Sequence, residues 1–317
     1  MRIHSSLPES VDRLTHGAVA IGNFDGVHLG HQALFRAAAK SARTHGGPAA
    51  ALTFEPHPAR ILAPQYAPPL ICEKARKREL IAASGIDDLI EQPFDAAFAA
   101  MDSARFVELL LATGAGEVVI GHDFTYGKAR AGTVQSLRGT LEEHGVRLNV
   151  VPPVAVNGLV CSSTKVREFV LEGRVEAANM ILGRPFDLDG EVVRGEGRGR
   201  KLGWPTANVR TANELLPAVG VYAVRAQVDG GPALAGAANL GLNPTFRSDA
   251  ALAGATGRPP LSLEVHLLGF SQDLYGKQLR VEFVHRLREE RRFPGIDALR
   301  EQIGRDVEAA GRLLGVV

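Results

Sequence analysis

Short apolar runs alternate with longer helical patterns over the first half of the chain. Strand-like runs cover residues 18–21, 49–54, 88–92 and 118–120. Apolar positions at helical spacing cover residues 31–45, 73–84 and 103–113. This alternation predicts a parallel sheet with helices on both faces. In such sheets ligands bind beyond the carboxyl ends of the strands.

The pattern changes near Gly183-Arg184-Pro185. Short β-rich runs separated by glycine or proline follow at residues 190–194, 222–228, 234–240, 261–268 and 278–283. Their spacing predicts a small antiparallel barrel or sandwich. A final helix is predicted over residues 296–314, and its apolar side carries Leu299, Ile303, Val307 and Leu314. The sequence therefore predicts two domains, 1–183 and 184–317.

Composition narrows the class of protein. The 317 residues are 45% hydrophobic and 22% charged, with 36 basic and 35 acidic side chains and a net charge of +1. This balance gives no reason to expect a nucleic acid or a membrane surface as partner. Two distant cysteines exclude a disulfide framework or a CxxC zinc site, and predict buried thiols in a reducing cytoplasm. No secretory signal and no apolar stretch of about 20 residues is evident.

Proline marks one segment between the predicted elements. Residues 63–70 read APQYAPPL, with three prolines, so no helix is expected there. The segment is either a surface loop or a flap over a ligand site.

The decapeptide GNFDGVHLGH, residues 22–31, follows the first predicted strand. His28 and His31 are three residues apart and share one face of a helix. Three interpretations are open: a metal site, structural histidines capping the first turn, or phosphate binding at a helix N-terminus. No third ligand stands at metal spacing, and the HExxH pattern is absent. Glycines here let the backbone approach a phosphate closely.

The heptapeptide CSSTKVR, residues 161–167, precedes a second helical run. Ser162, Ser163 and Thr164 can cap that helix or donate to a phosphate, and Arg167 can bind a phosphate through two hydrogen bonds. An ordinary capped surface helix is the alternative.

A glycine-rich basic run, GEGRGRKLGWPTAN, spans residues 195–208. Its backbone amides can cradle phosphates, although it is not a Walker A loop and a solvated basic turn is the alternative. The rigid turn 205–208 presents the oxygens of Thr206 and Asn208, which suit Mg²⁺. In the strand-like run 263–266, Glu264 and His266 share a face. Glu264 is either a general base or a plain solvent-facing glutamate.

These motifs carry a family resemblance. GNFDGVHLGH and SSTKVR resemble the G-x-F-D-x-x-H-x-G-H and S-S-T-x-x-R signatures of the nucleotidyltransferase superfamily. GHDFTYGKARAG, residues 121–132, resembles a segment of the FMN adenylyltransferase domain of bacterial bifunctional FAD synthetases, with Tyr126 in place of phenylalanine. GRGRKLGWPTAN resembles the riboflavin kinase signature, and residues 220–223, 239–246, 270–276 and 287–293 agree with that family. Residues 248–260 are longer than expected there.

The resemblance implies a Rossmann-like nucleotidyltransferase domain followed by a riboflavin kinase barrel with a terminal helix. In the barrel, it implies that Glu264 is the base, that Thr206 and Asn208 hold Mg²⁺, and that Arg288 steadies flavin or phosphate. The loop that covers the nucleotide contains Gly195, Gly197, Arg198, Gly199, Arg200 and Gly203. Riboflavin would be phosphorylated by ATP to FMN.

In the first domain, the resemblance implies adenylylation of FMN by ATP to FAD and pyrophosphate. His28 and His31 would stabilise charge on the reacting phosphates, and Asp123 would bind flavin or nucleotide. The other implied ATP-binding residues are Gly22, Phe24, Asp25, Gly30, Ser162, Ser163, Thr164 and Arg167.

The resemblance leaves three alternatives: an enzyme with one activity, an aminoacyl-tRNA synthetase, and a flavin sensor without turnover. Intact motifs in both halves argue against the first, and the charge and length argue against a tRNA-binding protein. A sensor would not need His28, His31, Thr206 and Glu264 together. We expect a cytoplasmic monomer or weak homo-oligomer that binds small molecules, with neither nucleic acid nor membrane as partner.

Overall fold

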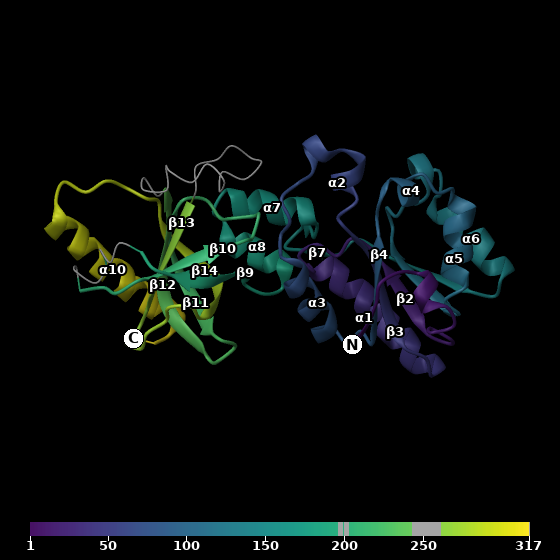
Figure 1. Ribbon diagram of the computed structural model, residues 1–317, viewed down its shortest axis with the longest axis horizontal. Coiled ribbons are helices and arrows are strands. Elements are labelled where there is room, and N and C mark those ends of the chain that lie inside the picture. Colours follow the sequence, from purple (N-terminus) through teal and green to yellow (C-terminus); the bar gives the residue numbers. More distant parts are fainter. Residues whose placement is uncertain (196–198, 200–202, 243–260, 317) are drawn as a thin grey trace. The chain divides into compact units, whose positions relative to one another are not determined.

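The computed structural model describes residues 1–195, 199, 203–242 and 261–316. The predictions for Gly197, Arg198, Arg200 and the segment 248–260 lie outside these residues. Backbone contacts divide the chain into two compact units, Met1–Ser163 and Thr164–Val317 (Figure 1). Each unit has its own sheet.

Six parallel strands form the sheet of the first unit, in the order β1-β4-β3-β2-β5-β6. The strands are β1 Arg2–His4, β2 Ala18–Ile21, β3 Ala49–Glu55, β4 Asp88–Pro93, β5 Glu117–Gly121 and β6 Arg147–Val151. The helices are α1 Leu29–His45, α2 Ala59–Leu62, α3 Lys74–Ala83, α4 Ala96–Ala99, α5 Ser103–Leu111 and α6 Val134–Glu143. Smaller elements are the 3₁₀ turns η1 Pro8–Ser10, η2 Pro64–Tyr66 and η3 Lys128–Arg130, and the hairpin β7 Ala155–Val156 with β8 Leu159–Val160.

Helices cover both faces of this sheet, as the sequence pattern predicts. On one face Ala20 and Ala51 pack with Phe35 of α1 and Ile81 of α3. On the other face Ile21, Leu52 and Ile120 belong to a cluster with side chains of α5 and α6. Consecutive residues of a strand point to opposite faces, which explains why these buried strands are apolar throughout.

The second unit contains a closed antiparallel barrel in the order β10-β13-β12-β11-β14-β9. Its strands are β9 Phe186–Val193, β10 Ala207–Thr211, β11 Gly220–Val228, β12 Ala233–Leu242, β13 Leu261–Leu267 and β14 Gln278–Arg288. The helices of this unit are α7 Ser163–Leu171, α8 Val175–Leu182 and α10 Ile296–Leu314. On α10, Ala310 and Leu314 pack with Ala223 and Ala237 of the barrel. The barrel and its terminal helix are confirmed.

Two expectations for local structure are wrong in part, and the strand β1 was not predicted. Residues 205–208 are not all turn, because Ala207 and Asn208 begin β10 and pair with β13 and β9. Residues 64–66 form the 3₁₀ turn η2, which proline tolerates at its first position. The polar strand β1 carries no apolar pattern, and its ladder with β4 and the charge of Asp88 hold it in the sheet.

Both cysteines are buried, as expected. Cys72 and Cys161 are 4% and 7% exposed, and neither forms a disulfide. Burial raises the pKa of the Cys161 thiol, which disfavours the reactive thiolate.

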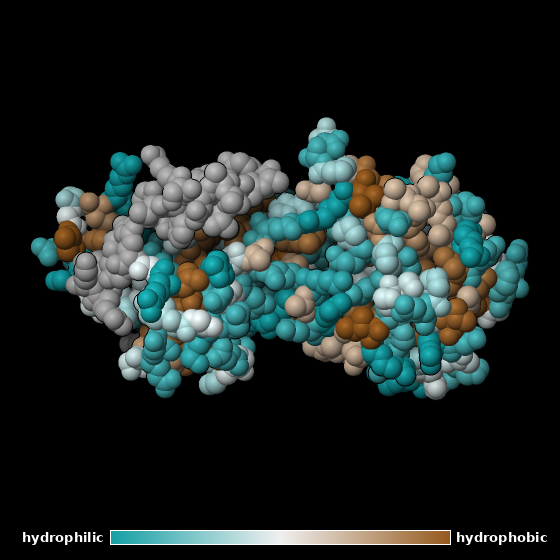
Figure 2. All heavy atoms as spheres, viewed as in Figure 1, coloured by the Kyte–Doolittle hydropathy of each residue, from teal (hydrophilic) through white to brown (hydrophobic). Residues whose placement is uncertain are grey.

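On the face shown in Figure 2, hydrophilic residues predominate and hydrophobic ones form scattered groups, which is normal for a folded protein surface. Among the described helices, none is long and apolar enough to cross a membrane.

Asp88 anchors β1 to β4 through buried charge. Its carboxylate is fully buried and accepts hydrogen bonds from Arg2 Nε at 2.8 Å, Arg2 Nη2 at 2.7 Å and His4 Nε2 at 2.8 Å. Burial acts to raise the pKa of Asp88, but the hydrogen bonds and charges of Arg2 and His4 outweigh it and hold the pKa below its usual value. The folded state therefore favours the ionised carboxylate.

We expect Asp88→Asn to lower the free energy of unfolding of the first unit by about 1–3 kcal/mol at pH 7. A lowered pKa stabilises the fold above the unfolded value of about 3.9, and that stability is lost as pH falls through the folded value. Urea unfolding from pH 7 to pH 2 should therefore show the wild-type and variant curves converging. A difference that stays constant over this range would contradict the ion-pair explanation.

Candidate active sites

The loop between β2 and α1 has an unusual backbone. Phe24, Gly26 and Val27 have φ angles of 51°, 78° and 45°, in the left-handed region that side chains disfavour. A Cβ on Gly26 would lie 2.7 Å from the Ile71 side chain, and one on Gly22 would lie 2.8 Å from the Phe24 ring. The glycines of the decapeptide therefore allow a tightly packed loop, and Phe24 itself is fully buried.

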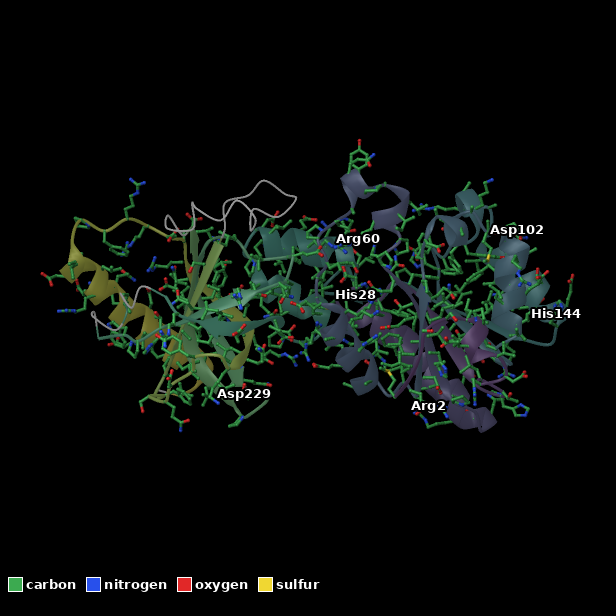
Figure 3. All side chains as sticks on the ribbon, in the orientation of Figure 1. Arg2, His28, Arg60, Asp102, His144 and Asp229 are labelled. Carbon is green, nitrogen blue, oxygen red and sulfur yellow. The ribbon has the colours of Figure 1, made fainter. Side chains whose placement is uncertain are left out.

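His28 ends this loop and caps α1 (Figure 3). Its Nδ1 accepts hydrogen bonds from the amides of Gly30 at 3.1 Å and His31 at 3.4 Å. In the neutral ring the proton is then on Nε2, which is a donor. A Cβ on Gly30 would lie 2.9 Å from the His28 ring, so glycine leaves room for this imidazole.

His31 stacks on His28 with ring centroids 3.6 Å apart, and its ring also meets the edge of Phe24. Burial lowers the pKa of His31 well below its usual value, and the charges of His28 and Lys77 lower it further. The ring is therefore neutral at pH 7. Its Nδ1 is buried and has no hydrogen-bond partner among the described residues. Buried polar atoms are nearly always satisfied, so this nitrogen makes His31 a candidate for contact with a ligand.

Asp25 joins three segments that are distant in sequence. Its carboxylate accepts the amide proton of Ile71 at 3.0 Å, and its backbone carbonyl accepts the Ser163 hydroxyl at 2.9 Å. This brings residues 22–31, the end of the proline-rich segment and the first residue of α7 together. Ser162 directly precedes α7, and Thr164 and Arg167 are on α7 in the second compact unit.

Asp123 follows β5 at the carboxyl edge of the sheet, and its side chain is 84% exposed. A group of aromatic rings that the sequence prediction missed surrounds the ends of the same strands. Ring contacts connect Phe54, Phe94, Phe98, Phe106, Tyr126 and Phe124. The available signal was that Phe54 ends one predicted strand and that Phe94 and Phe124 follow shortly after two others.

The barrel brings Glu264 and Asn208 together by strand register. Glu264 on β13 pairs with Asn208 on β10 and with Asn239 on β12. Directly opposed residues share a face of the sheet, so the carboxylate stands between two amides. The sequence prediction included Glu264 and Asn208 and missed Asn239, because strand order is not visible in the chain.

The described ends of the glycine-rich loop approach the predicted metal ligands. A Cβ on Gly195 would collide with the Asn208 amide, and one on Gly199 would lie 2.9 Å from Thr206 Oγ1. Gly203 has a φ of 89°, which favours glycine. Gly195, Gly199, Thr206 and Asn208 therefore form one constellation.

His266 holds the turn before β10. Its Nδ1 lies 2.7 Å from the carbonyl oxygen of Pro205, and this ring nitrogen must donate because a carbonyl only accepts. Trp204 meets the His266 ring edge-on at 5.4 Å. The turn that presents Thr206 is thus fixed from β13, two residues after Glu264.

Arg288, the last residue of β14, is held by α10. Its Nε and Nη2 donate to the buried carboxylate of Asp306 at 3.0 and 2.7 Å, and Nη1 donates to the Glu289 carbonyl at 2.9 Å. Gln302 also donates to Asp306, at 2.8 Å. The charge of Arg288 is therefore largely balanced within the protein, and Asp306 is a further residue that the sequence prediction missed.

Side-chain chemistry at the barrel site fits magnesium. Thr206 and Asn208 would supply hard oxygen ligands, and Glu264 lies opposite Asn208 in the strand register. Among the described residues, no group of three or more His, Cys, Asp or Glu could hold a metal ion. A cation here would therefore depend on neutral oxygens and nucleotide phosphates as well as a carboxylate.

Comparison with known proteins agrees with this division into two sites. The family model described as FAD synthetase matches residues 11–165, and the model described as riboflavin kinase matches residues 182–314. The bifunctional riboflavin kinase/FMN adenylyltransferase of Pseudomonas fluorescens is 36% identical over 98% of this chain and 96% of its own length. The enzyme of the same name from Bacillus subtilis (strain 168) is 35% identical, with 98% and 97% covered.

A solved structure has the same fold throughout. The crystal structure titled macrolide-efflux protein from Streptococcus pneumoniae has a TM-score of 0.86 and 30% identity, and 98% of each chain is covered. Similarity along nearly the full length to relatives with both domains places the chain in one family. The chain belongs to the family of bifunctional riboflavin kinase/FMN adenylyltransferases.

Proposed function

We propose that this chain makes FAD in two ATP-dependent steps, phosphorylating riboflavin in the barrel and adenylylating FMN at the parallel sheet. The observation that carries the second activity is the stacked His28–His31 pair with its buried, unpartnered Nδ1. The barrel site alone would account for a kinase. A flavin sensor would need neither this pair nor the Glu264–Asn208 register.

In the kinase step, Glu264 accepts the proton of the ribityl 5′-hydroxyl. The hydroxyl oxygen then forms a bond to the γ-phosphorus of ATP, and the bond to ADP breaks. Thr206 and Asn208 would hold Mg²⁺ and phosphates, and the bound cation would neutralise phosphate charge. The nucleotide is covered by the glycine-rich loop, which includes Gly195, Gly199 and Gly203. Catalysis in this step therefore depends on positioning and electrostatics.

In the adenylyl step, a phosphate oxygen of FMN attacks the α-phosphorus of a second ATP and pyrophosphate leaves. FMN is already anionic, so this site needs no general base. His28 donates through Nε2 and neutral His31 hydrogen-bonds to the charged oxygens. The backbone amides at the N-terminus of α1 add the positive end of the helix dipole, which stabilises the phosphate charge. By motif, Gly22, Phe24, Asp25 and Gly30 shape the ATP site, and Ser162, Ser163, Thr164 and Arg167 complete it.

Flavin would occupy different surroundings in the two sites. In the barrel, Arg288 steadies flavin or phosphate in the orientation set by Asp306. At the parallel sheet, the isoalloxazine ring would lie near the aromatic group and Asp123. Aromatic faces stabilise a planar ring by stacking.

The functional division that we propose is 1–183 for the adenylyltransferase and 184–317 for the riboflavin kinase. The family models leave residues 166–181 unassigned between them. By motif, Thr164 and Arg167 belong to the adenylyltransferase. We further propose a cytoplasmic monomer or weak homo-oligomer whose partners are small molecules and not nucleic acid.

A time course with riboflavin, ATP and Mg²⁺ tests the proposed function. Chromatography should show FMN first and FAD after it, and EDTA in excess of Mg²⁺ should stop both products. FMN without FAD, also when FMN is supplied directly, would contradict the adenylyl site. Neither product from either flavin would favour the sensor.

A further inference from the structure

Lys77 is a buried cation that the mechanism above does not use. It lies on α3 and is 8% exposed, whereas lysines almost never become buried without strong compensation. Its ammonium forms an ion pair with Glu55 at the end of β3, at 3.3 Å. That carboxylate is itself 28% exposed, so the ion pair is long and partly solvated.

The pair lines a small cavity beside the decapeptide. Asn23 and Asp25 from the decapeptide and Cys72 form the wall with Glu55 and Lys77. The side chain of Asp25 is buried there and already accepts the Ile71 amide. Lys77 therefore faces the loop that positions His28 and His31.

Lys77 also acts on His31 through its charge. The charge of Lys77 disfavours protonation of His31, whose Nδ1 is buried without a partner among the described residues. Asp25, Glu55 and Lys74 line the same cavity as Lys77, so an anion would pair with the Lys77 ammonium by taking the place of the Glu55 carboxylate. The carboxylate that pairs with the Lys77 ammonium is that of Glu55.

We propose that Lys77 is a phosphate-binding residue of the adenylyl site and that Glu55 is its counter-ion while no polyphosphate is bound. The inference rests on the proposed adenylyltransferase function. A structural ion pair and a phosphate-binding cation with a counter-ion make opposite predictions for Glu55. In the first case loss of either partner is harmful, and in the second loss of Glu55 strengthens anion binding.

The test uses inorganic pyrophosphate as the probe. Its inhibition constant is measured against FAD formation from FMN in the full-length protein, and its dissociation constant is measured by calorimetry. Lys77→Met should weaken pyrophosphate binding about tenfold to a hundredfold, the range for a charge-assisted hydrogen bond. Glu55→Gln should strengthen it several-fold, and Lys77→Arg should retain most of the affinity.

Lys40→Met is the matched control, because Lys40 is an exposed lysine of α1. Riboflavin phosphorylation by each variant reports whether the rest of the chain is intact. Weaker pyrophosphate binding in both Lys77→Met and Glu55→Gln, or a Lys77→Met variant that matches Lys40→Met, would overturn the inference. If Lys77→Met does not fold, Glu55→Gln decides alone: tighter binding supports the inference and unchanged or weaker binding overturns it. Failure of the proposed function is a separate result, since wild-type protein would then form no FAD.

Discussion

His28→Ala should abolish FAD formation from FMN and leave FMN formation from riboflavin nearly intact. The substitution removes the Nε2 donor, the ring stacked on His31 and the Nδ1 cap of α1 together. Loss of one preorganised donor to a developing charge typically lowers kcat about 10²–10³-fold. Loss of the cap adds destabilisation of about 1 kcal/mol. Both reactions are measured by chromatography on the same preparation.

Two further variants separate chemistry from folding. His28→Asn restores a good N-cap without an imidazole, so it should recover stability and not FAD formation. His144→Ala changes an exposed histidine at the end of α6 and should affect neither step. If His28→Ala in a folded protein lowered both steps equally, the assignment of separate sites would be wrong.

Local spacing predicted that His28 and His31 lie close together, and it predicted little of their surroundings. The expectation that His28 and His31 share a helix face is wrong in part, because His28 is the extended N-cap of α1 and only His31 is on the helix, although their rings still stack. The contacts of Asp25 with Ile71 and Ser163 join residues far apart in the chain. The periodicity of residues within one helix or strand does not predict such long-range contacts. The burial of Lys77 could not be predicted for the same reason. In the sequence alone, a buried lysine on an amphipathic helix looks like a solvent-exposed one.

Register explains the corresponding result in the barrel. Glu264 was identified by its strand-like surroundings, but its position opposite Asn208 and Asn239 depends on which strands are neighbours. Because residues 205–208 were predicted as a turn, the start of β10 and its pairing with β13 were not predicted. Arg288 was identified by resemblance alone, whereas its orientation comes from Asp306 on the terminal helix. The helix was predicted correctly, and its carboxylate was not recognised because its partner is on another element.

Glu191→Gln provides the matched control for the second large effect. Glu191 lies on β9 of the same barrel and pairs at the surface with Arg210. Exposed pairs contribute about 0–1 kcal/mol, so this variant should keep both activities. Comparing Glu191→Gln with Glu264→Gln separates the specific role of Glu264 from the general effect of losing one negative charge.

Glu264→Ala should abolish FMN formation while FAD formation from supplied FMN continues, the reverse of the His28 result. An alcohol is a weak nucleophile until its proton is removed, and loss of a general base typically lowers the rate about 10²–10⁴-fold. Glu264→Gln keeps the shape beside Asn208 and Asn239 and removes only the basic carboxylate, so it should lose almost as much. Initial rates with riboflavin and, separately, with FMN measure both steps. A Glu264→Gln variant that forms FMN within threefold of wild type would exclude Glu264 as the base, and a parallel loss of FAD formation from FMN would instead indicate that the two sites are not independent.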